Sequence, residues 1–426
     1  MDPQAGVAPD ALLEWRREFP TTEATLHFIS HSLGAMPRGV EAALAEYARL
    51  WRTRGIRAWE EGWFELPTRA GDILGTILNA PPGSISMCEN VTTAEAVALS
   101  AVDFQAPRNR LVCTAEDFPS QLYFYEGLER RGAEVVRVPA RQGHRIAAAD
   151  VIAAIDERTA VVAISHVLFR SSQVVDVRAI AARARGAGAL TLIDAYQAVG
   201  TVPVDVQALD VDFLAGGSVK WLCGGPGAGY LYARPATAGR LRPAFTGWLA
   251  HEDPFAFDSG PMRWHSGARR FWTGTPAIPA FAAARCGYEI IAKIGVAAIR
   301  AKSLRQTARM IALADEYGIA VGSPRAEFER GGHGIERILA LEQMARRGEL
   351  HVAHGLDRDR LAAPAHPANG VSAVHVPSGL RPPNALVRGG WRLAPESRHR
   401  IKPASGGWRR GTAAQRMNPR RLITTL

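Results

Sequence analysis

An aspartate and a lysine stand at the ends of two apolar stretches that follow each other in the chain. Asp194 ends the stretch 190–194, and Lys220 stands 26 residues later, just beyond the stretch 212–216. A lysine amine can bond to the aldehyde of a pyridine aldehyde, while a buried carboxylate keeps its ring nitrogen protonated, so that the ring can accept electrons. The pair predicts pyridoxal 5'-phosphate as the cofactor, with Lys220 and Asp194 as catalytic residues.

The other groups that this cofactor requires have candidates in the same part of the chain. Thr92 and Thr93 open an alanine-rich segment, and the N–H groups at a helix N-terminus bind phosphate. Gln197 can donate a hydrogen bond to the ring hydroxyl, and Phe118 can cover the ring face. Each residue alone has a simpler explanation as a cap, a core residue or a surface residue. Their order along one series of strands and helices favours the cofactor site.

The segment that carries these residues alternates short apolar runs with helical stretches. The runs predict strands at 110–114, 134–138, 160–165, 190–194, 212–216 and 229–232. Near-continuous apolar strands separated by helices indicate an α/β fold with a mostly parallel mixed sheet sandwiched by helices. Ligands of such sheets lie beyond the carboxyl ends of the strands, where Ser165, Asp194 and Lys220 fall.

The chain divides into four predicted regions. Residues 1–55 form an N-terminal arm and an amphipathic helix, and residues 56–285 form the large cofactor-binding domain, with a further helix over 68–79. Residues 286–350 form part of a small α/β C-terminal domain. A long helix over 280–317, a strand at 319–321 and a helix over 335–347 are expected there. Residues 351–426 form an atypical basic tail, interpreted as disordered or frameshifted.

Composition excludes several classes of protein. The 426 residues are 47% hydrophobic and 22% charged, and no signal peptide or membrane-length apolar run is recognised, so we expect a cytoplasmic protein. The net charge of +10 comes from the tail. Residues 351–426 hold 13 of the 51 Lys and Arg but only three of the 41 Asp and Glu, which leaves 38 of each sign in the first 350. A nucleic-acid partner is therefore not expected.

The four cysteines stand far apart, without the spacing of metal ligands or of a disulfide framework. We expect reduced thiols and no metal site.

Several motifs resemble the class V aminotransferase group of fold-type I pyridoxal-phosphate enzymes, and within it the kynureninases. The segment 28–37 is similar to the kynureninase Gly-Asn-Ser-Leu-Gly-x-x-Pro, and Phe118-Pro119-Ser120 to its Phe-Pro-Ser loop. Segments 165–167, 246–251 and 270–276 match further motifs. The resemblance covers about residues 20–330.

The resemblance implies roles for individual residues. Thr92, Thr93 and Ser165 would lie at the cofactor, with Phe118 stacked on its ring. His31 and Ser32 would contact the substrate, an amino acid. Trp248 and Thr275 would reach the phosphate from a neighbouring subunit, which implies a homodimer. The implied reaction is hydrolysis of the Cβ–Cγ bond of L-kynurenine or 3-hydroxykynurenine to alanine and an anthranilate, within tryptophan catabolism and NAD biosynthesis.

The chain also departs from the kynureninase pattern. Gln197 stands in place of a histidine, Val219 in place of a tyrosine and Gln121 in place of an aspartate. The C-terminal arginine motif that would bind the substrate carboxylate has only a displaced echo at 390–395. Two alternatives therefore stay open. One is another class V enzyme, an aminotransferase or a cysteine desulfurase, although the last cysteine, Cys286, falls in a predicted helix. The other is an inactive protein that binds the cofactor.

Overall fold

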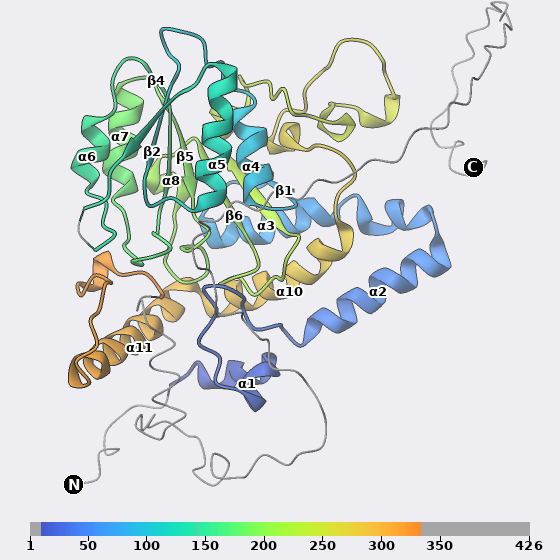
Figure 1. The fold of residues 1–426 in the computed structure, drawn as a ribbon. Coiled ribbons are helices and arrows are strands. Elements are labelled where there is room, and N and C mark those ends of the chain that lie inside the picture. The colour runs from blue at the N-terminus through green and yellow to red at the C-terminus, as the bar shows by residue number, and fades with distance from the viewer. Residues whose placement is uncertain (1–9, 142, 334–426) are drawn as a thin grey trace, which may run out of the picture. The chain divides into compact units, whose positions relative to one another are not determined.

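The computed structural model describes residues 10–141 and 143–333, all of which belong to one compact unit. Its centre is a seven-stranded sheet with helices on both faces (Figure 1). The predicted helix 335–347, the echo of the arginine motif and the basic tail lie outside the described residues, so these predictions are untested.

The sheet has the order β1-β7-β6-β5-β4-β2-β3. Strand β7 runs antiparallel to both its neighbours, β1 and β6, and the remaining pairs are parallel. The predicted α/β class with a mostly parallel mixed sheet is confirmed. The strands are β1 (Ile85–Cys88), β2 (Arg110–Thr114), β3 (Glu134–Val138), β4 (Thr159–Ser165), β5 (Leu190–Asp194), β6 (Phe213–Gly217) and β7 (Gly229–Ala233).

Two hydrophobic clusters, one on each face of the sheet, explain why the central strands are apolar throughout. Successive residues of a strand point to opposite faces. Ile193 and Leu214 belong to the cluster that includes residues of the helices α3 (Leu66–Leu78), α7 (Val177–Gly186) and α10 (Ile278–Ile294). Leu192 and Phe213 belong to the cluster that includes residues of the helices α4 (Val91–Leu99) and α5 (Pro119–Leu128). Burial on both faces removes the polar alternation that a half-exposed strand would show.

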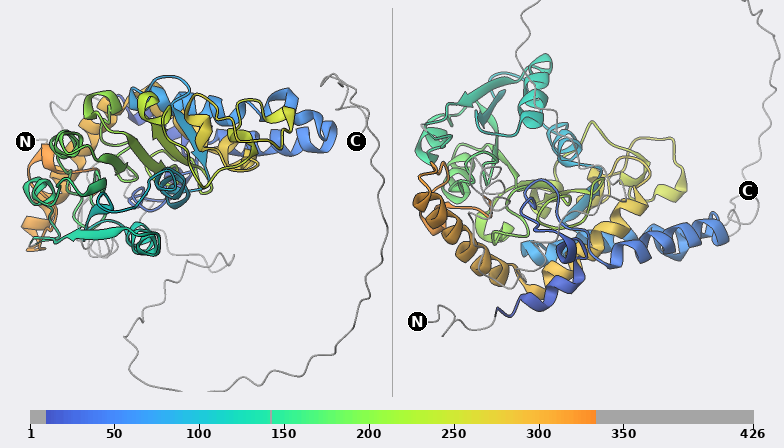
Figure 2. Two further views of the ribbon diagram at one scale, coloured as in Figure 1. Left: turned by 90° about the horizontal axis from the view of Figure 1, so that it is seen from above. Right: turned by 60° about the horizontal axis from the view of Figure 1, so that its bottom comes forward.

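The principal helices are α2 (Gly39–Arg54), α3 (Leu66–Leu78), α4 (Val91–Leu99), α5 (Pro119–Leu128), α6 (Ala148–Ala153), α7 (Val177–Gly186), α10 (Ile278–Ile294) and α11 (Val296–Glu316). Of these, α3 lies within two residues of the predicted 68–79, and α2 is the amphipathic helix expected within residues 1–55. Short helices α1 (Thr21–Ala24), α8 (Val206–Leu209) and α9 (Pro235–Ala238) connect them. Helix α10 packs against α2 and α3 (Figure 2).

Two sequence expectations are wrong in the region after residue 279. The single helix predicted over 280–317 is two helices, because Gly295 adopts φ +81° and ψ +129° and separates α10 from α11. Gly318 does follow the end of α11, as predicted. The strand predicted at 319–321 is absent, and no other strand of the described residues lies beside it to pair with its backbone.

None of the helices within residues 10–141 and 143–333 is long and apolar enough to cross a lipid bilayer.

Candidate active site

The carboxyl ends of β2, β4 and β5 are tied together around one buried carboxylate. Ser165 and Asp194 are register partners at the ends of β4 and β5. Asp117, after β2, accepts a hydrogen bond from the Ser165 backbone N–H at Oδ1 and one from the Thr114 N–H at Oδ2, both at 2.7 Å. Asp117 thus fixes the edge of the sheet from which Asp194 projects.

Lys220 lies in the loop between β6 and β7, surrounded by aromatic rings. Its Nζ is 4.5 Å from the centroid of the Tyr196 ring and 5.6 Å from that of Phe118. Tyr196 can lie this close to the sheet because residue 217 is glycine: a Cβ there would come within 2.5 Å of the Tyr196 hydroxyl. The structure thus brings Phe118 to Lys220 and adds Tyr196.

Burial shifts the ionisation of both predicted catalytic groups. It raises the pKa of Asp194 to about 6, against the lowering effects of the Tyr196 backbone N–H at 2.8 Å and of the Lys220 charge. Burial lowers the pKa of Lys220, and the attraction of Asp194 offsets part of that effect. A lysine with a lowered pKa carries a larger fraction of free amine, which is the nucleophilic form.

The N-terminus of α4 lies beside the strand that precedes Lys220. Asn90 caps the helix, because its Oδ1 accepts the Thr93 N–H at 2.9 Å. A Cβ at Gly229 would come within 2.6 Å of Asn90 Cα, and Gly229 is the register partner of Gly217. The Thr92 N–H is in the first turn, where a helix offers no acceptor of its own, so this end of α4 suits an anion.

The N-terminal segment packs onto the lysine loop. The Gly34 N–H donates to the Val219 carbonyl at 2.7 Å, and a Cβ at residue 34 would lie 2.1 Å from the Lys220 carbonyl oxygen. Gln197 Nε2 donates to the His31 carbonyl at 3.0 Å. His31 is thereby placed near Lys220, and one of the two amide N–H groups of Gln197 has a partner. Ser32, in the same turn, is exposed.

Trp248 and Thr275 stand apart from this group. The Trp248 indole contacts the rings of Phe255 and Phe257, at centroid distances of 5.8 and 6.0 Å, and Thr275 is exposed. Among the described residues neither makes a hydrogen bond or ring contact with Lys220, Asp194 or Phe118. Their predicted roles require a second subunit and stay predictions.

Four residues of the site were not predicted from the sequence: Asp117, Tyr196, Trp221 and His333. The first three adjoin residues that were predicted, so chain proximity was an available signal. Trp221 Nε1 donates to Gln197 Oε1 at 2.9 Å, which fixes the amide orientation of Gln197. His333 packs on His31, with ring centroids 5.5 Å apart. No motif marked it.

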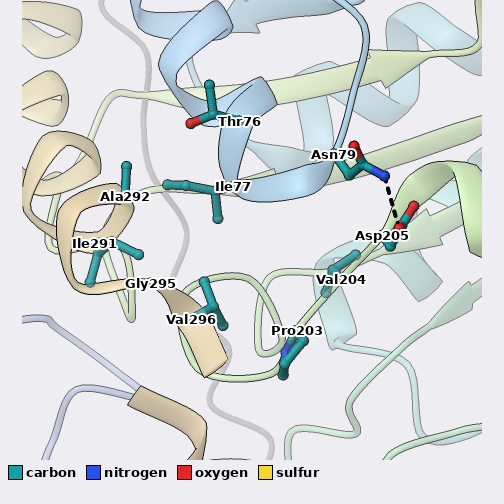
Figure 3. Close-up of a pocket in the computed structure, with 10 residues that line it drawn as sticks. All are labelled: Thr76, Ile77, Asn79, Pro203, Val204, Asp205, Ile291, Ala292, Gly295 and Val296. Atoms are coloured by element: carbon teal, nitrogen blue, oxygen red, sulfur yellow. Dashed lines mark hydrogen bonds between the residues drawn. The ribbon is translucent and has the colours of Figure 1, made fainter. Parts of the chain in front are cut away.

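A pocket of about 390 Å³ lies elsewhere, beside the break between α10 and α11 (Figure 3). Its walls include Ile77, Val204 and Ile291, and none of the site residues lines it. Asp205, the ionisable residue in it, caps α8 by accepting two backbone N–H groups, and accepts a third hydrogen bond from Asn79. This carboxylate is occupied by three structural hydrogen bonds, so the residues that line the pocket offer no ionisable side chain for catalysis.

His166, the neighbour of Ser165, makes the fold sensitive to acid. Burial lowers its pKa to about 4, from 6.5 for an ordinary histidine. The unfolded chain therefore binds a proton below about pH 6.5 while the folded chain does not, and stability is lost as the pH falls from 7 towards 4.

We expect His166→Gln to reduce the pH dependence of stability. Wild-type protein should lose about 2 kcal/mol of unfolding free energy through this group between pH 8 and pH 5. The variant has no such proton to gain. The difference between its unfolding free energies at pH 8 and pH 5, measured by urea unfolding, should therefore be smaller than that of wild type by about 2 kcal/mol. The same pH dependence in both proteins would show that His166 titrates normally. Measurement at pH 8, where the histidine is neutral in both states, is the internal reference.

A mostly parallel sheet that presents a half-buried lysine, a buried carboxylate and a helix N-terminus at one edge defines a pyridoxal-phosphate enzyme of fold type I. The family model "Aminotransferase class-V" matches residues 67–327. The chain belongs to the class V aminotransferase family, as its motifs predicted. The predicted cofactor, pyridoxal 5'-phosphate, is confirmed with the family.

Curated relatives of this chain include kynureninases. The kynureninase of Pseudomonas fluorescens is 30% identical over 342 residues, which cover 76% of this chain and 80% of that protein. The kynureninase of Deinococcus radiodurans is 31% identical over the same length and covers the same shares.

Solved structures with the same fold include enzymes of cysteine metabolism. The apo structure of a cysteine desulfurase from Thermococcus onnurineus superposes with a TM-score of 0.68 at 21% identity, covering 79% of this chain and 85% of that one. A C-DES mutant with glycine covalently linked to its pyridoxal-phosphate cofactor gives a TM-score of 0.63 at 24% identity, over 70% and 79% of the two chains. At these identities the likeness shows the fold alone.

Proposed function

We propose that this protein is a kynureninase-like hydrolase that cleaves the Cβ–Cγ bond of L-kynurenine or 3-hydroxykynurenine to an anthranilate and alanine. The observation that carries the proposal is the half-buried Lys220, with Asp194 at the end of the strand that precedes its own, in a chain with about 30% identity to kynureninases over most of their length. Pyridoxal phosphate, when bound, supplies the electron sink that makes a bond to the substrate Cβ breakable.

Each residue of the site has a task that its surroundings support. With the cofactor bound, Asp194 would keep its ring nitrogen protonated, and Lys220 would hold its aldehyde and serve as the acid and base at the substrate Cα. The second amide N–H of Gln197 is available to the ring hydroxyl, since Trp221 and His31 fix the rest of that side chain. Phe118 covers the ring. Thr92, Thr93 and Ser165 bind polar parts of the cofactor, the two threonines through the N-terminus of α4.

The proposed function also implies that the protein is a homodimer. Trp248 is 41% exposed and Thr275 is exposed, although both stand in motifs shared with kynureninases. A second copy that received these side chains at its own phosphate site would give both residues a task and would cover the indole. The small C-terminal domain predicted from residue 286 onward would complete the substrate site.

A second candidate is a cysteine desulfurase or lyase, or an aminotransferase of the same family. Gln197 favours it, because kynureninases have a histidine at this position. Desulfuration needs a nucleophilic thiolate, whereas Cys286 lies within α10 and burial raises the pKa of its thiol. Transamination makes no such demand. The third candidate is an inactive protein that binds the cofactor. It is supported by the lack of a good sequence match to the carboxylate-binding arginine motif at the expected distance.

Assay of the purified full chain with the cofactor and L-kynurenine tests the proposal. We expect release of fluorescent anthranilate together with an equal amount of alanine. Parallel reactions with L-cysteine plus a thiol reductant, and with L-alanine plus a 2-oxo acid as amino-group acceptor, discriminate the candidates: sulfide from cysteine would identify a desulfurase, and pyruvate from alanine a transaminase. Cofactor that binds but reacts with none of the three amino acids would identify the inactive protein.

A further inference from the structure

His333 is held in place by a segment that docks on the loop after β4. The Gly331 N–H donates to the Ser172 carbonyl at 2.7 Å, and the Val174 N–H donates to the Glu329 carbonyl at 2.8 Å. The glycines are needed for this approach. A Cβ at Gly331 would lie 2.7 Å from Ser172 Oγ, and one at Gly332 would lie 2.3 Å from a side-chain oxygen of Thr201. The backbone that carries His333 is therefore fixed on two sides.

The hydrogen bonds of His333 determine its tautomer. Nε2 lies 3.1 Å from the Phe169 carbonyl, which can only accept, so Nε2 carries the proton. Nδ1 lies 3.3 Å from Ser172 Oγ and accepts from that hydroxyl. Both ring nitrogens are thus satisfied in the neutral form. Burial, reinforced by the neighbouring His31 and Lys220, lowers the pKa of His333 to about 3, so the ring is uncharged at neutral pH.

The ring of His333 supports that of His31. The two imidazoles are stacked, with centroids 5.5 Å apart and planes 13° apart, and the Trp221 indole lies 6.2 Å from His333. The backbone of His31 is held by Gln197. His333 is only 8% exposed, whereas His31 is half-buried, so His31 is the member of the pair that a ligand can reach. Burial lowers the pKa of His31, and the positive charge of Lys220 lowers it further.

Aromatic faces therefore surround Lys220 from separate parts of the chain. Tyr196 and Phe118 lie near its amine, and Phe169 contacts Phe118 edge to face at 5.1 Å. The stacked pair His31 and His333 adds a further flat surface, built from residues about 300 positions apart in the sequence. Flat faces of this kind favour a planar ring over a small aliphatic side chain, because stacked rings gain energy beyond the area they bury.

We propose that His333 is a positioning residue that holds the His31 ring against the substrate, and that this stacked pair selects amino acids with a planar aromatic side chain. The inference rests on the function proposed above, in which the substrate reacts at Lys220. It concerns the choice of side chain and not the bond that is cleaved.

The test compares ligand affinities in the full-length holoenzyme. Dissociation constants for L-phenylalanine and L-alanine are measured from the change in cofactor absorbance. In His333→Ala we expect the constant for L-phenylalanine to rise about two- to tenfold, as the loss of one ring contact implies, with that for L-alanine unchanged. His333→Phe, which keeps a ring, should restore most of the preference. His333→Gln, which keeps a donor and an acceptor but no ring, should not.

The ratio of the two dissociation constants separates selection from structural damage, because damage to the site would weaken both ligands alike. Phe328→Ala, on the same segment but with its ring 79% exposed, is the matched control and should leave the ratio unchanged. If His333→Ala does not fold, the difference between His333→Phe and His333→Gln still shows whether a ring at this position sets the preference for L-phenylalanine. An unchanged ratio, or equal loss for both ligands, would overturn the inference.

The outcome is independent of the kynurenine assay. A changed ratio in an enzyme that releases no anthranilate would support the stacked pair and reject the hydrolase. Anthranilate release with an unchanged ratio would support the hydrolase and reject selection by the stacked pair.

Discussion

Lys220→Ala will abolish both the visible absorption of bound cofactor and turnover of the amino-acid substrate. The amine is the group that bonds to the aldehyde, and no other described lysine lies within the aromatic enclosure formed by Phe118 and Tyr196. Proton transfer by a positioned side chain contributes about 10²–10⁴-fold to rates, so turnover should fall by at least that factor. Absorbance spectra of the dialysed variant and an assay at saturating cofactor provide the two measurements.

The matched control for this change is Lys293→Ala. Lys293 lies in the last turn of α10 and is exposed. Its loss should leave absorbance and turnover as in wild type. Retention of the cofactor absorbance in Lys220→Ala would mean that another amine bonds to the aldehyde, and the assignment of the site would be wrong.

Asp194→Asn should lose catalysis and gain stability in the cofactor-free protein. The variant keeps the shape of the side chain but loses the charge that holds the ring nitrogen protonated. Removal of one preorganised electrostatic group costs about 10²–10³-fold in turnover, so we expect a loss of that order. The substrate dissociation constant should change less than turnover, because the carboxylate acts through the ring and does not contact the substrate.

The gain in stability follows from the raised pKa of Asp194. The folded protein holds this proton up to about pH 6. The unfolded chain releases it near pH 4, so the stability that the group contributes is complete below pH 4 and lost as the pH rises through 6. At pH 8 the ionised, buried carboxylate then costs up to about 3 kcal/mol relative to a neutral side chain.

Urea unfolding of the cofactor-free proteins measures this effect. Asp194→Asn should be more stable than wild type at pH 8, and the difference should disappear near pH 4. Asp103→Asn, which changes an exposed carboxylate, is the control and should show neither effect. A variant that is less stable at pH 8 would mean that the electrostatic attraction between Asp194 and Lys220 outweighs the cost of burying the carboxylate.

Much of the sheet could be predicted because burial on both faces leaves a strong sequence signal. The strands β2 to β7 are runs of apolar residues, and each was expected within a residue or two of its observed ends. Strand β1 was missed. Its four residues, Ile85–Cys88, include a serine that is buried despite its polarity, and the strand is too short for a period to emerge. The break at Gly295 was missed because the apolar pattern continues across it.

The candidate site was predictable where residues lie next to strand ends. Chain order placed Ser165, Asp194 and Lys220 at one edge, since parallel strands end on the same side of a sheet. Asp117 adjoins Phe118 in the chain, but its role was overlooked because its hydrogen bonds to two backbone N–H groups form only after folding. His333 shares no element with the residues it touches, so only the tertiary structure could bring it to His31.

The hydrogen bond between Gln197 and the His31 carbonyl limits when the candidate active site can form during synthesis of the chain. The two residues are 166 positions apart, and closing so long a loop is favourable only after both ends have surfaces to bury. A ribosome exposes residues 31–34 long before it has made the lysine loop on which they dock. The amino-terminal segment must therefore wait, without its partner, until β6 and β7 emerge. An incomplete chain that is released before that point contains residues 31–34 but lacks Lys220, the residue expected to bind the cofactor.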